Sequence, residues 1–588
     1  MNILGINAYH GDASAVLVRD GQLVAAIEEE RFRRVRHVAG FPREAVRACL
    51  RIGGLDGRDI QHVGVSRNPR AHIIGKGLFA LRHRSDRRVT SDRVATGRRV
   101  HEMPETIAGV LGLKAGEKRP EVHWVEHHPA HLASAFFVSP FEEAAVCAID
   151  GFGDFVSTSS AHGRANRIDM IERTYFPHSL GMLYLAITQY LGFMNYGDQT
   201  TAMGLAPYGT PDFTNEIAKL VRLRRNGGFE LDLSYFSHWP GGASMTWDDG
   251  EPKVGRIFTD KLEALLGPAR REGEPLAKRH AAIAASLQAV FEGAFFHVLN
   301  ALHERIPAPD LCLAGGCAMN SVANGKIRDR TPFKDLFIQP AAADSGSALG
   351  AAYWIWHQVL KKPRGFVMKH AYWGPEFQEV ELEAVLSTRA AELESAGCIV
   401  NAFRDTYRLT EFTADRLAKG QIVGWFQGRM EWGGRALGNR SILADPRRAD
   451  LREVLTKRIN FREKFQVFAT SVREGGHFEY FGDAMPDPFM MQACPIQADK
   501  RTIVPAVTHV DGSARPHTVT VEANPLYWEL LRAFERRTGI PMLLNTSFNE
   551  DEPIVLEPGE ALDCFLRTRM DVLVLGNTVV TKAAGEAT

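Results

Sequence analysis

The first thirty residues alternate short apolar runs with polar turns. The apolar runs are NILGINAY and AVLVRDGQLVAAIEEE, and the polar segment GDAS lies between them. Within the second run, Asp20-Gly21 is a dipeptide typical of a tight hairpin turn. The pattern therefore predicts a strand, a turn and a strand hairpin at the start of the chain.

The same pattern returns near residue 145. The segment reads AAVCAIDGFGDFVSTSSAHGR, and each copy ends its first apolar strand on a polar or acidic residue, Asn7 or Asp150, with glycine close behind. Turns of this kind at a strand end expose backbone N–H groups, which commonly bind phosphate. We therefore expect the two copies to form a nucleotide site.

Two further glycine turns follow a long amphipathic segment at 278–303. Its apolar residues recur at helical spacing, which predicts a core helix. The turns are LCLAGGCAMNSVANGKI and, after the strand-like run DLFIQP, ADSGSALGAA. Two similar halves with two more glycine turns predict a duplicated α/β nucleotide-binding fold of the actin and sugar-kinase type.

The run KKPRGFVMKHAYWGP has the composition of a linker. Beyond it, helix-like VELEAVLSTRAAELESAG and TADRLAKG alternate with strand-like IVGWF, PMLLNTSF and DVLVLGN. We therefore expect two domains, residues 1–365 and 366–588, the second also α/β. The arginine-rich segment 82–99 predicts a solvated insertion, with contact to an anion as the alternative.

The composition favours an enzyme that acts on small molecules. The 588 residues carry 70 Lys and Arg against 70 Asp and Glu, so the formal net charge is zero. We therefore expect no nucleic-acid and no membrane partner. The start turns polar within seven residues, and we expect neither a signal peptide nor a membrane-spanning segment, hence a cytoplasmic protein. Seven scattered cysteines without a CxxC pair predict buried thiols.

The segment EHHPAHLASAFF sets two histidines four residues apart, so that both lie on one helix face. It lacks the glutamate that the zinc-protease motif places after its first histidine, because His128 stands there. Asp150 and Asp344, each at a predicted strand end, supply two carboxylates to accompany His127 and His131. Two imidazoles with two carboxylates suit a borderline divalent ion such as iron or zinc.

The motifs HHPAH, AIDGFGD, LAGGCAMN and AAADSGSALGAA, in this order, resemble those of the NodU/CmcH/TobZ-type carbamoyltransferases. The resemblance runs almost end to end. It also covers HGDASAVL, EEERFRRVRH, MGLAPYG, GRMEWGGRALGNRSILADPR, DGSARPHTV and LLNTSFN.

This resemblance implies a reaction in two steps, each in a different domain. Residues 1–365 would form an actin/sugar-kinase-like domain similar to the metal domain of tRNA threonylcarbamoyl transferases. Residues 366–588 would form a YrdC-like domain that makes carbamoyl-adenylate from carbamoyl phosphate and ATP. The first domain would then transfer the carbamoyl group to a hydroxyl, less often an amine, of a small natural-product acceptor. The expected cofactors are ATP as co-substrate and a divalent metal, with iron(II) favoured over zinc.

The resemblance also implies roles for individual residues. The expected catalytic residues are His10, the base, and Asp12. The expected metal ligands are His127, His131, Asp150 and Asp344. Nucleotide binding would fall to Gly151, Gly153, Gly315, Gly316 and Asn320. Carbamoyl phosphate and the adenylate would meet Arg435, Arg440, Asn460, Gln466, Arg515, Asn545 and Ser547. Taken without the resemblance, the same residues also fit a turn histidine, plain glycine turns and surface arginines.

The segment INFREKFQVFATSV departs from the family pattern. Asn460 and Gln466 stand where the family has the lysine and arginine expected to hold carbamoyl phosphate. Charge-assisted hydrogen bonds contribute roughly 1.5–3 kcal/mol each, against about 1 kcal/mol for neutral ones. Losing two cations would weaken a phosphate site about a hundredfold or more. Thr201, in place of a lysine, and Gly434, in place of a proline, are further departures.

Three functions therefore stay open at this point. The first is an ATP-dependent carbamoyltransferase with an altered grip on carbamoyl phosphate. The second is an enzyme on the same scaffold that adenylates and transfers a different small acyl group. The third is a binding protein that keeps the metal and nucleotide folds without turnover. No motif identifies the acceptor, and none predicts an oligomeric state.

Overall fold

The structure is a computed structural model that describes residues 1–82, 97–239, 245–246, 250–459, 465 and 468–582. The chain divides into two compact units, Met1–Met368 and Lys369–Thr588. Residues 83–96 of the arginine-rich segment lie outside the described residues, as do Asn460 and Gln466.

The first sheet of unit 1 has the strand order β3-β2-β1-β4-β5. The three N-terminal strands form an antiparallel meander, and β4 and β5 add in parallel. The strands are β1 (Asn2–Asn7), β2 (Ser14–Arg19), β3 (Gln22–Glu28), β4 (His62–Val65) and β5 (Glu121–Trp124). Asp20 and Gly21 connect β2 to β3 with φ of 49° and 79°, so the predicted hairpin is confirmed.

The second sheet repeats this connectivity in the order β14-β13-β6-β7-β8. Again three antiparallel strands are extended by two parallel ones. The strands are β6 (Glu143–Gly153), β7 (Val156–Arg164), β8 (Arg167–Tyr175), β13 (Asp310–Ala314) and β14 (Asp335–Phe337). Since both sheets connect their strands in the same way, the predicted duplicated α/β fold is confirmed.

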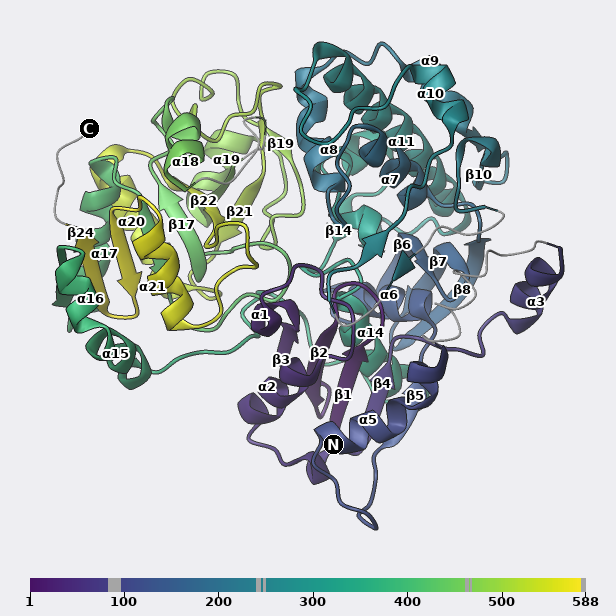
Figure 1. Ribbon diagram of the computed structural model, residues 1–588, viewed down its shortest axis with the longest axis horizontal. Helices are drawn as coiled ribbons and strands as arrows, with labels where there is room; N and C mark the ends of the chain where they lie inside the picture. The colour runs from purple at the N-terminus through teal and green to yellow at the C-terminus, as the bar shows by residue number, and fades with distance from the viewer. Residues whose placement is uncertain (83–96, 240–244, 247–249, 460–464, 466–467, 583–588) are drawn as a thin grey trace. The chain divides into compact units, whose positions relative to one another are not determined.

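Helices α6 (His127–Phe136) and α14 (Gly346–Trp354) pack against each other in unit 1 (Figure 1). Helix α6 follows β5 of the first sheet but packs on β6, β7 and β13 of the second, whereas α14 follows the second sheet and packs on β1, β2 and β4. A Cβ on Gly350 would lie 1.7 Å from the carbonyl oxygen of Ala130. The small residues of GSALGAAYW therefore allow the two helices to touch.

The longest helix, α11 (Lys278–Arg305), covers the predicted amphipathic segment. By length and composition it could cross a membrane, so the expectation that no segment is long enough is wrong for α11. However, 78% of its most apolar window is buried inside the structure. Its apolar residues thus serve the core of unit 1, in agreement with the helical spacing.

The other helices of unit 1 are short. They are α1 (Glu30–Arg33), α2 (Arg43–Gly53), α3 (Ile73–Arg82), α5 (Met103–Val110), α7 (Leu180–Tyr190), α8 (Gln199–Leu205), α9 (Thr214–Ile217), α10 (Asp260–Leu266), α12 (Ser321–Asn324) and α13 (Ile327–Arg330). Two hairpins, β9 (Val221–Leu223) with β10 (Phe229–Leu231) and β11 (Met245–Thr246) with β12 (Lys253–Val254), complete the described part of this unit.

Unit 2 is built on a mixed sheet of order β15-β24-β23-β16-β17-β22-β18-β21. The strands are β15 (Cys398–Ala402), β16 (Val423–Phe426), β17 (Arg440–Ala444), β18 (Ala469–Arg473), β21 (Pro516–Val519), β22 (Met542–Ser547), β23 (Val572–Leu575) and β24 (Thr578–Lys582), with a separate pair β19 (Cys494–Pro495) and β20 (Ser513–Ala514). The helices are α15 (Glu379–Thr388), α16 (Ala390–Ser395), α17 (Thr406–Ala418), α18 (Leu451–Ile459), α19 (His477–Phe481), α20 (Pro525–Thr538) and α21 (Pro558–Arg567). The second α/β unit is therefore confirmed.

All seven cysteines are free thiols, six of them buried and Cys398 partly exposed.

Candidate functional site

Two histidines and two aspartates meet in the interior of unit 1. His127 and His131 lie one turn apart on α6, Asp150 lies in β6, and Asp344 precedes α14. His127 Nε2 is 3.0 Å from His131 Nε2, 3.3 Å from Asp150 Oδ2 and 3.4 Å from Asp344 Oδ1. His131 Nε2 is also 3.4 Å from Asp344 Oδ1. The structure thus gathers all four residues that the sequence nominated, and all four are buried.

The geometry of this cluster fits a divalent metal ion. Ligand atoms held tetrahedrally at about 2.0–2.1 Å from an ion lie about 3.3 Å from one another, close to the separations above. The Asp150 and Asp344 carboxylates are both buried, and Asp344 Oδ1 lies 3.4 Å from both His127 Nε2 and His131 Nε2. Burying two carboxylates together is costly, and a divalent cation would offset that cost.

Local backbone features hold the cluster in place. The backbone N–H of His127, at the start of α6, donates to Asp154 Oδ2 at 3.0 Å. The N–H of Gly316 donates to Asp150 Oδ1 at 2.7 Å. A Cβ on Gly153 would lie 2.0 Å from the imidazole of His127, so only glycine leaves room for that ring. Each histidine and carboxylate is therefore oriented by neighbours that contribute no ligand atom.

The four groups also complement each other in charge. Burial lowers the pKa of His127, but its hydrogen bonds to Asp150 and Asp344 outweigh burial and raise that pKa to about 10. Burial and Asp344 raise the pKa of Asp150, yet His127 and His131 bring it down to about 2. The pKa of Asp344 likewise lies well below its usual value, against burial, because of the neighbouring histidines. Both carboxylates are therefore ionised at neutral pH.

The two expected catalytic residues face different neighbours. His10 Nδ1 lies 2.6 Å from Asp344 Oδ2, which places this imidazole beside the cluster. Asp12 Oδ1 lies 2.7 Å from His37 Nδ1 instead. The pKa of His37 is lowered by burial but raised, to about 9 in net, by Asp12 and Glu30. His10 thus adjoins the cluster, whereas Asp12 forms an ion pair with His37.

The expected nucleotide residues line two turns near Asp150. Gly315 has φ of 89°, and a Cβ there would lie 2.3 Å from the Ile149 carbonyl oxygen, so this turn requires glycine. A Cβ on Gly151 would have no neighbouring atom within 4 Å. Asn320 Oδ1 accepts from the Ala323 N–H and Asn320 Nδ2 donates to Gln288 Oε1, so its side chain belongs to an internal network.

In unit 2 the residues expected to bind carbamoyl phosphate lie near the same ends of neighbouring strands. Arg440 begins β17, Arg515 immediately precedes β21, and Asn545 and Ser547 lie at the end of β22. Strands β17 and β18 run antiparallel to β22, and β21 runs parallel to β18. The starts of β17, β18 and β21 therefore lie beside the end of β22. Arg435 lies in the connection that leads into β17.

Arg440 is fully buried and bound to main-chain oxygens. Its Nη1 donates to the carbonyl oxygen of Gln427 at 2.5 Å, and its Nη2 donates to that of Gly428 at 3.2 Å. The guanidinium carbon lies 3.6 Å from the ring centroid of Phe426. The structure thus uses Arg440 to fix the loop between β16 and β17, a role that the spacing of the motif did not reveal.

Several buried polar atoms near these strand ends have no hydrogen-bond partner among the described residues: Arg435 Nε, Asn545 Oδ1, Arg440 Nε and Thr546 Oγ1. Arg435 Nε is buried and donates to nothing, and Asn545 Oδ1 is buried and accepts from nothing. Burial lowers the pKa of Arg435 to about 10, with Asp487 opposing that shift. Asn545 Nδ2, in contrast, donates to Ser471 Oγ at 2.8 Å and to the Ala436 carbonyl oxygen at 3.1 Å. An unused donor and an unused acceptor in buried positions indicate a polar ligand.

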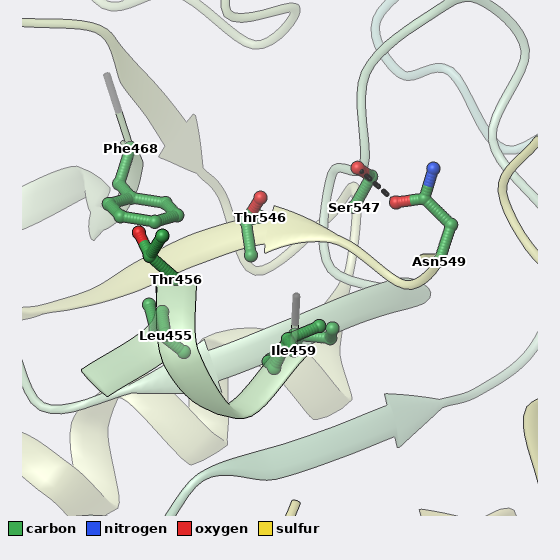
Figure 2. Close-up of a pocket in the computed structure, with 8 residues that line it drawn as sticks. Leu455, Thr456, Ile459, Phe468, Thr546, Ser547 and Asn549 are labelled. Carbon is green, nitrogen blue, oxygen red and sulfur yellow. Dashed lines mark hydrogen bonds between the residues drawn. The ribbon is translucent and has the colours of Figure 1, made fainter. Parts of the chain in front are cut away.

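A small pocket opens at the same strand end. Figure 2 shows Leu455, Thr456 and Ile459 of α18 on one side, with Thr546, Ser547 and Asn549 along the end of β22. Ser547 Oγ donates to Asn549 Oδ1 at 2.7 Å, the bond drawn there. Ile459, which lines the pocket, directly precedes Asn460 in the chain.

Comparison with known families decides the identity. The family model of the carbamoyltransferase N-terminus matches residues 2–353, and that of the carbamoyltransferase C-terminus matches residues 414–582. The chain belongs to the carbamoyltransferase family. It is accordingly a transferase, and the resemblance seen in the motifs is confirmed.

Relatives of this carbamoyltransferase span its whole length. It is 39% identical to the uncharacterized protein sll1178 of Synechocystis, over 99% of this chain and 97% of the relative. It is 36% identical to the nodulation protein NolNO of Sinorhizobium fredii, over 98% of this chain and 80% of the relative. Among solved structures, HypF of T. kodakarensis aligns with 61% of this chain and 48% of its own, at 14% identity and a TM-score of 0.31.

Sequence reasoning missed several residues of this carbamoyltransferase. Burial raises the pKa of Tyr196 well above its usual value, and the charges of Asp344, Asp12 and Asp150 add to that shift. A Cβ on Gly11, next to Asp12, would lie 2.8 Å from the Tyr196 hydroxyl oxygen. Tyr196 stands in NYGDQTTAMGLAPYG, just before the family motif MGLAPYG, and that proximity was its only signal.

Glu431 was missed in the C-terminal motif. Its Oε1 accepts from the N–H groups of Leu437, Asn439 and Arg440 at 2.8, 2.8 and 3.1 Å. This buried carboxylate therefore shapes the loop that carries Arg435. The motif GRMEWGGRALGNR contains both residues, but their contact depends on the path of the loop.

Proposed function

We propose that this carbamoyltransferase forms carbamoyl-adenylate from carbamoyl phosphate and ATP in unit 2. Unit 1 then transfers the carbamoyl group to a hydroxyl, less often an amine, of a small natural-product acceptor. Family membership of both halves supports carbamoyl transfer. The observation that carries the proposal is that Arg435 Nε and Asn545 Oδ1, both in unit 2, are buried without a hydrogen-bond partner among the described residues.

The adenylation step balances as follows. Water cleaves carbamoyl phosphate to carbamate and phosphate, and a carbamate oxygen then attacks the α-phosphorus of ATP and displaces pyrophosphate. Arg435 opposes the negative charge of these phosphates, since a buried guanidinium binds anions strongly. Asn545 Oδ1 accepts a hydrogen bond from the carbamoyl NH₂ group. We thus assign Arg435 to the phosphate end of the substrate and Asn545 to its carbamoyl end.

The transfer step uses unit 1. The acceptor oxygen attacks the carbamoyl carbon, the bond from that carbon to the AMP oxygen breaks, and AMP leaves. His10 donates its Nδ1 proton to Asp344 at 2.6 Å, and this tautomer leaves the lone pair on Nε2, which takes the acceptor's proton. A divalent ion bound by His127, His131, Asp150 and Asp344, iron(II) or zinc, would supply a Lewis acid here.

A second candidate donor is a different small carboxylic acid. The specific observation in its favour is that Asn460 and Gln466 are neutral where the family has cations. The third possibility considered above, a scaffold without turnover, is not proposed because the chain belongs to a family of enzymes. We also propose a cytoplasmic location, which the seven free thiols support.

Pyrophosphate release from ATP tests the proposal. We expect release that requires carbamoyl phosphate, and we expect Arg435→Gln to raise the KM for carbamoyl phosphate about tenfold or more, from the loss of one charge-assisted hydrogen bond. Arg532→Gln is the matched control, because this arginine pairs with Glu529 on an exposed helix face. Release that requires another small carboxylate would favour the second candidate, and no release with any donor would contradict adenylation.

A further inference from the structure

A second cluster of metal-ligating side chains lies on the first sheet of unit 1. It consists of His62 at the start of β4 and of Glu121 and His123 in β5. His62 Nδ1 is 3.0 Å from His123 Nε2 and 3.5 Å from Glu121 Oε2, and His123 Nε2 is 3.7 Å from Glu121 Oε1. One potential ligand atom from each of the three residues therefore lies within 4.8 Å of the other two.

These separations resemble those of the first cluster. There, too, the two imidazole nitrogens are 3.0 Å apart, and the nitrogen-to-carboxylate separations run from 3.3 to 3.9 Å. Two imidazole nitrogens and one carboxylate oxygen form a donor set typical of zinc and similar borderline ions. The remaining coordination positions would be filled by water, since the Glu121 side chain is 67% exposed.

The sheet register explains how the cluster arises. His62 and Glu121 are direct partners in the parallel pairing of β4 with β5, and His123 is paired with Gly64. Gly64 adds no side chain beside His123, so the imidazole can reach diagonally to His62. His62 and Glu121 thus begin their strands, and His123 lies within β5, whereas α6 with its two ligands of the first cluster follows the carboxyl end of β5.

We propose that His62, Glu121 and His123 bind a divalent ion, zinc or a similar borderline metal, as a clamp between β4 and β5. Strand β5 has four residues and lies at the edge of its sheet, so few backbone hydrogen bonds hold it. The chain between the two strands runs from residue 66 to residue 120, and a metal bond across its ends closes that long loop. The ion stabilises unit 1 and takes no part in carbamoyl transfer.

Zinc titration of the full chain, stripped of metal, against a chromophoric chelator tests this site. We expect two tight equivalents in the wild type and one in His123→Ala, with the rate of carbamoyl transfer unchanged. We expect Glu121→Gln, a change at an exposed position, to weaken binding of the second zinc ion more than about a hundredfold. Loss of a group that only hydrogen-bonds to a metal ligand already lowers metal affinity about 10–100-fold. Zinc should raise the unfolding temperature less in either variant than in the wild type.

His162→Ala is the matched control, because His162 pairs with a single carboxylate, Glu143, on the surface of the same unit. It should keep both equivalents. One equivalent in the wild type, or two equivalents of unchanged affinity in both His123→Ala and Glu121→Gln, would overturn the proposal. Neither result depends on carbamoyl transfer, so failure of the clamp and failure of the proposed function can be told apart.

Discussion

At the residue scale, the proposed mechanism makes His10 the base that takes the proton of the acceptor. We predict that His10→Gln lowers the rate of carbamoyl transfer by about 10²–10⁴-fold, the usual contribution of a general base. Its metal content should equal that of the wild type, because His10 lies beside the cluster of His127, His131, Asp150 and Asp344 and is not one of the four. Single-turnover transfer and metal analysis measure the two quantities.

His162→Gln is the control for this variant. His162 Nε2 lies 2.6 Å from Glu143 Oε1, the same separation as in the pair of His10 with Asp344, but this pair is on the surface. It should keep the wild-type rate. Equal rates in His10→Gln and His162→Gln would remove His10 from the mechanism.

Glu29 makes the stability of unit 1 depend on pH. Burial raises its pKa from 4.5 to about 7, although the N–H groups of Ala45 and Glu44 partly oppose that shift. Between these two values the folded state binds more protons than the unfolded state, so stability falls as pH rises from about 4.5 to about 7. The loss amounts to about 3 kcal/mol at about 1.4 kcal/mol per pKa unit.

We therefore predict that Glu29→Gln is more stable relative to the wild type at pH 8 than at pH 5. Urea unfolding of both proteins across this range measures the difference. Asp415→Asn, which changes an exposed pair with Lys419, should show a far smaller change with pH. A difference between Glu29→Gln and the wild type that does not vary with pH would contradict the shifted pKa.

Individual residues could be predicted where one local pattern placed them. His127 and His131 were found because four residues make one helical turn, and Asp150 and Asp344 because each ends a strand-like run. The pairing of Asp12 with His37 and the grip of Arg440 on main-chain oxygens were not found. Both depend on how loops fold back, which no short-range pattern encodes.

At the element scale, the packing of α6 on α14 brings His127 and His131 of α6 close to Asp344, which precedes α14. We predict that Gly350→Ala destabilises the protein by about 1–3 kcal/mol, because its Cβ would meet the Ala130 carbonyl oxygen and force the helices apart. Metal affinity should fall as well, since α6 carries His127 and His131 while Asp344 precedes α14. Thermal unfolding and metal titration measure these effects.

The matched control for this change is Gly293→Ala on α11. A Cβ on Gly293 would meet nothing within 4 Å, so alanine should leave metal affinity unchanged and stabilise the helix by about 0.5–1 kcal/mol. If Gly350→Ala behaved like Gly293→Ala, the close contact of α6 with α14 would not matter for the site.

Most elements could be predicted from periodicity, but their partners could not. The hairpin at Asp20-Gly21 and the helix α11 follow from turn chemistry and helical spacing. Helix α6 packs on the second sheet and α14 on the first, and no pattern in the sequence predicts which sheet each helix contacts. Only the repeat of the strand pattern indicated that two equivalent sheets would exist.

At the scale of the whole molecule, the proposed function divides the reaction between the two units. We predict that removing the metal abolishes acceptor carbamoylation while pyrophosphate release that depends on carbamoyl phosphate continues, because the nominated adenylation residues belong to unit 2. Adding iron(II) or zinc should restore transfer to the wild type but not to His131→Ala, which lacks one ligand. Loss of both activities on metal removal would contradict this division of labour.

The central claim is that the carbamoyl group travels as an adenylate. Carbamoyl phosphate labelled with ¹⁸O at both oxygens bonded to carbon tests it most directly, with mass spectrometry of the AMP recovered after transfer. If a carbamate oxygen attacks the α-phosphorus and the acceptor then displaces AMP at carbon, that oxygen stays on phosphorus, and the AMP gains ¹⁸O. AMP without label, or formation of ADP in its place, would contradict the account.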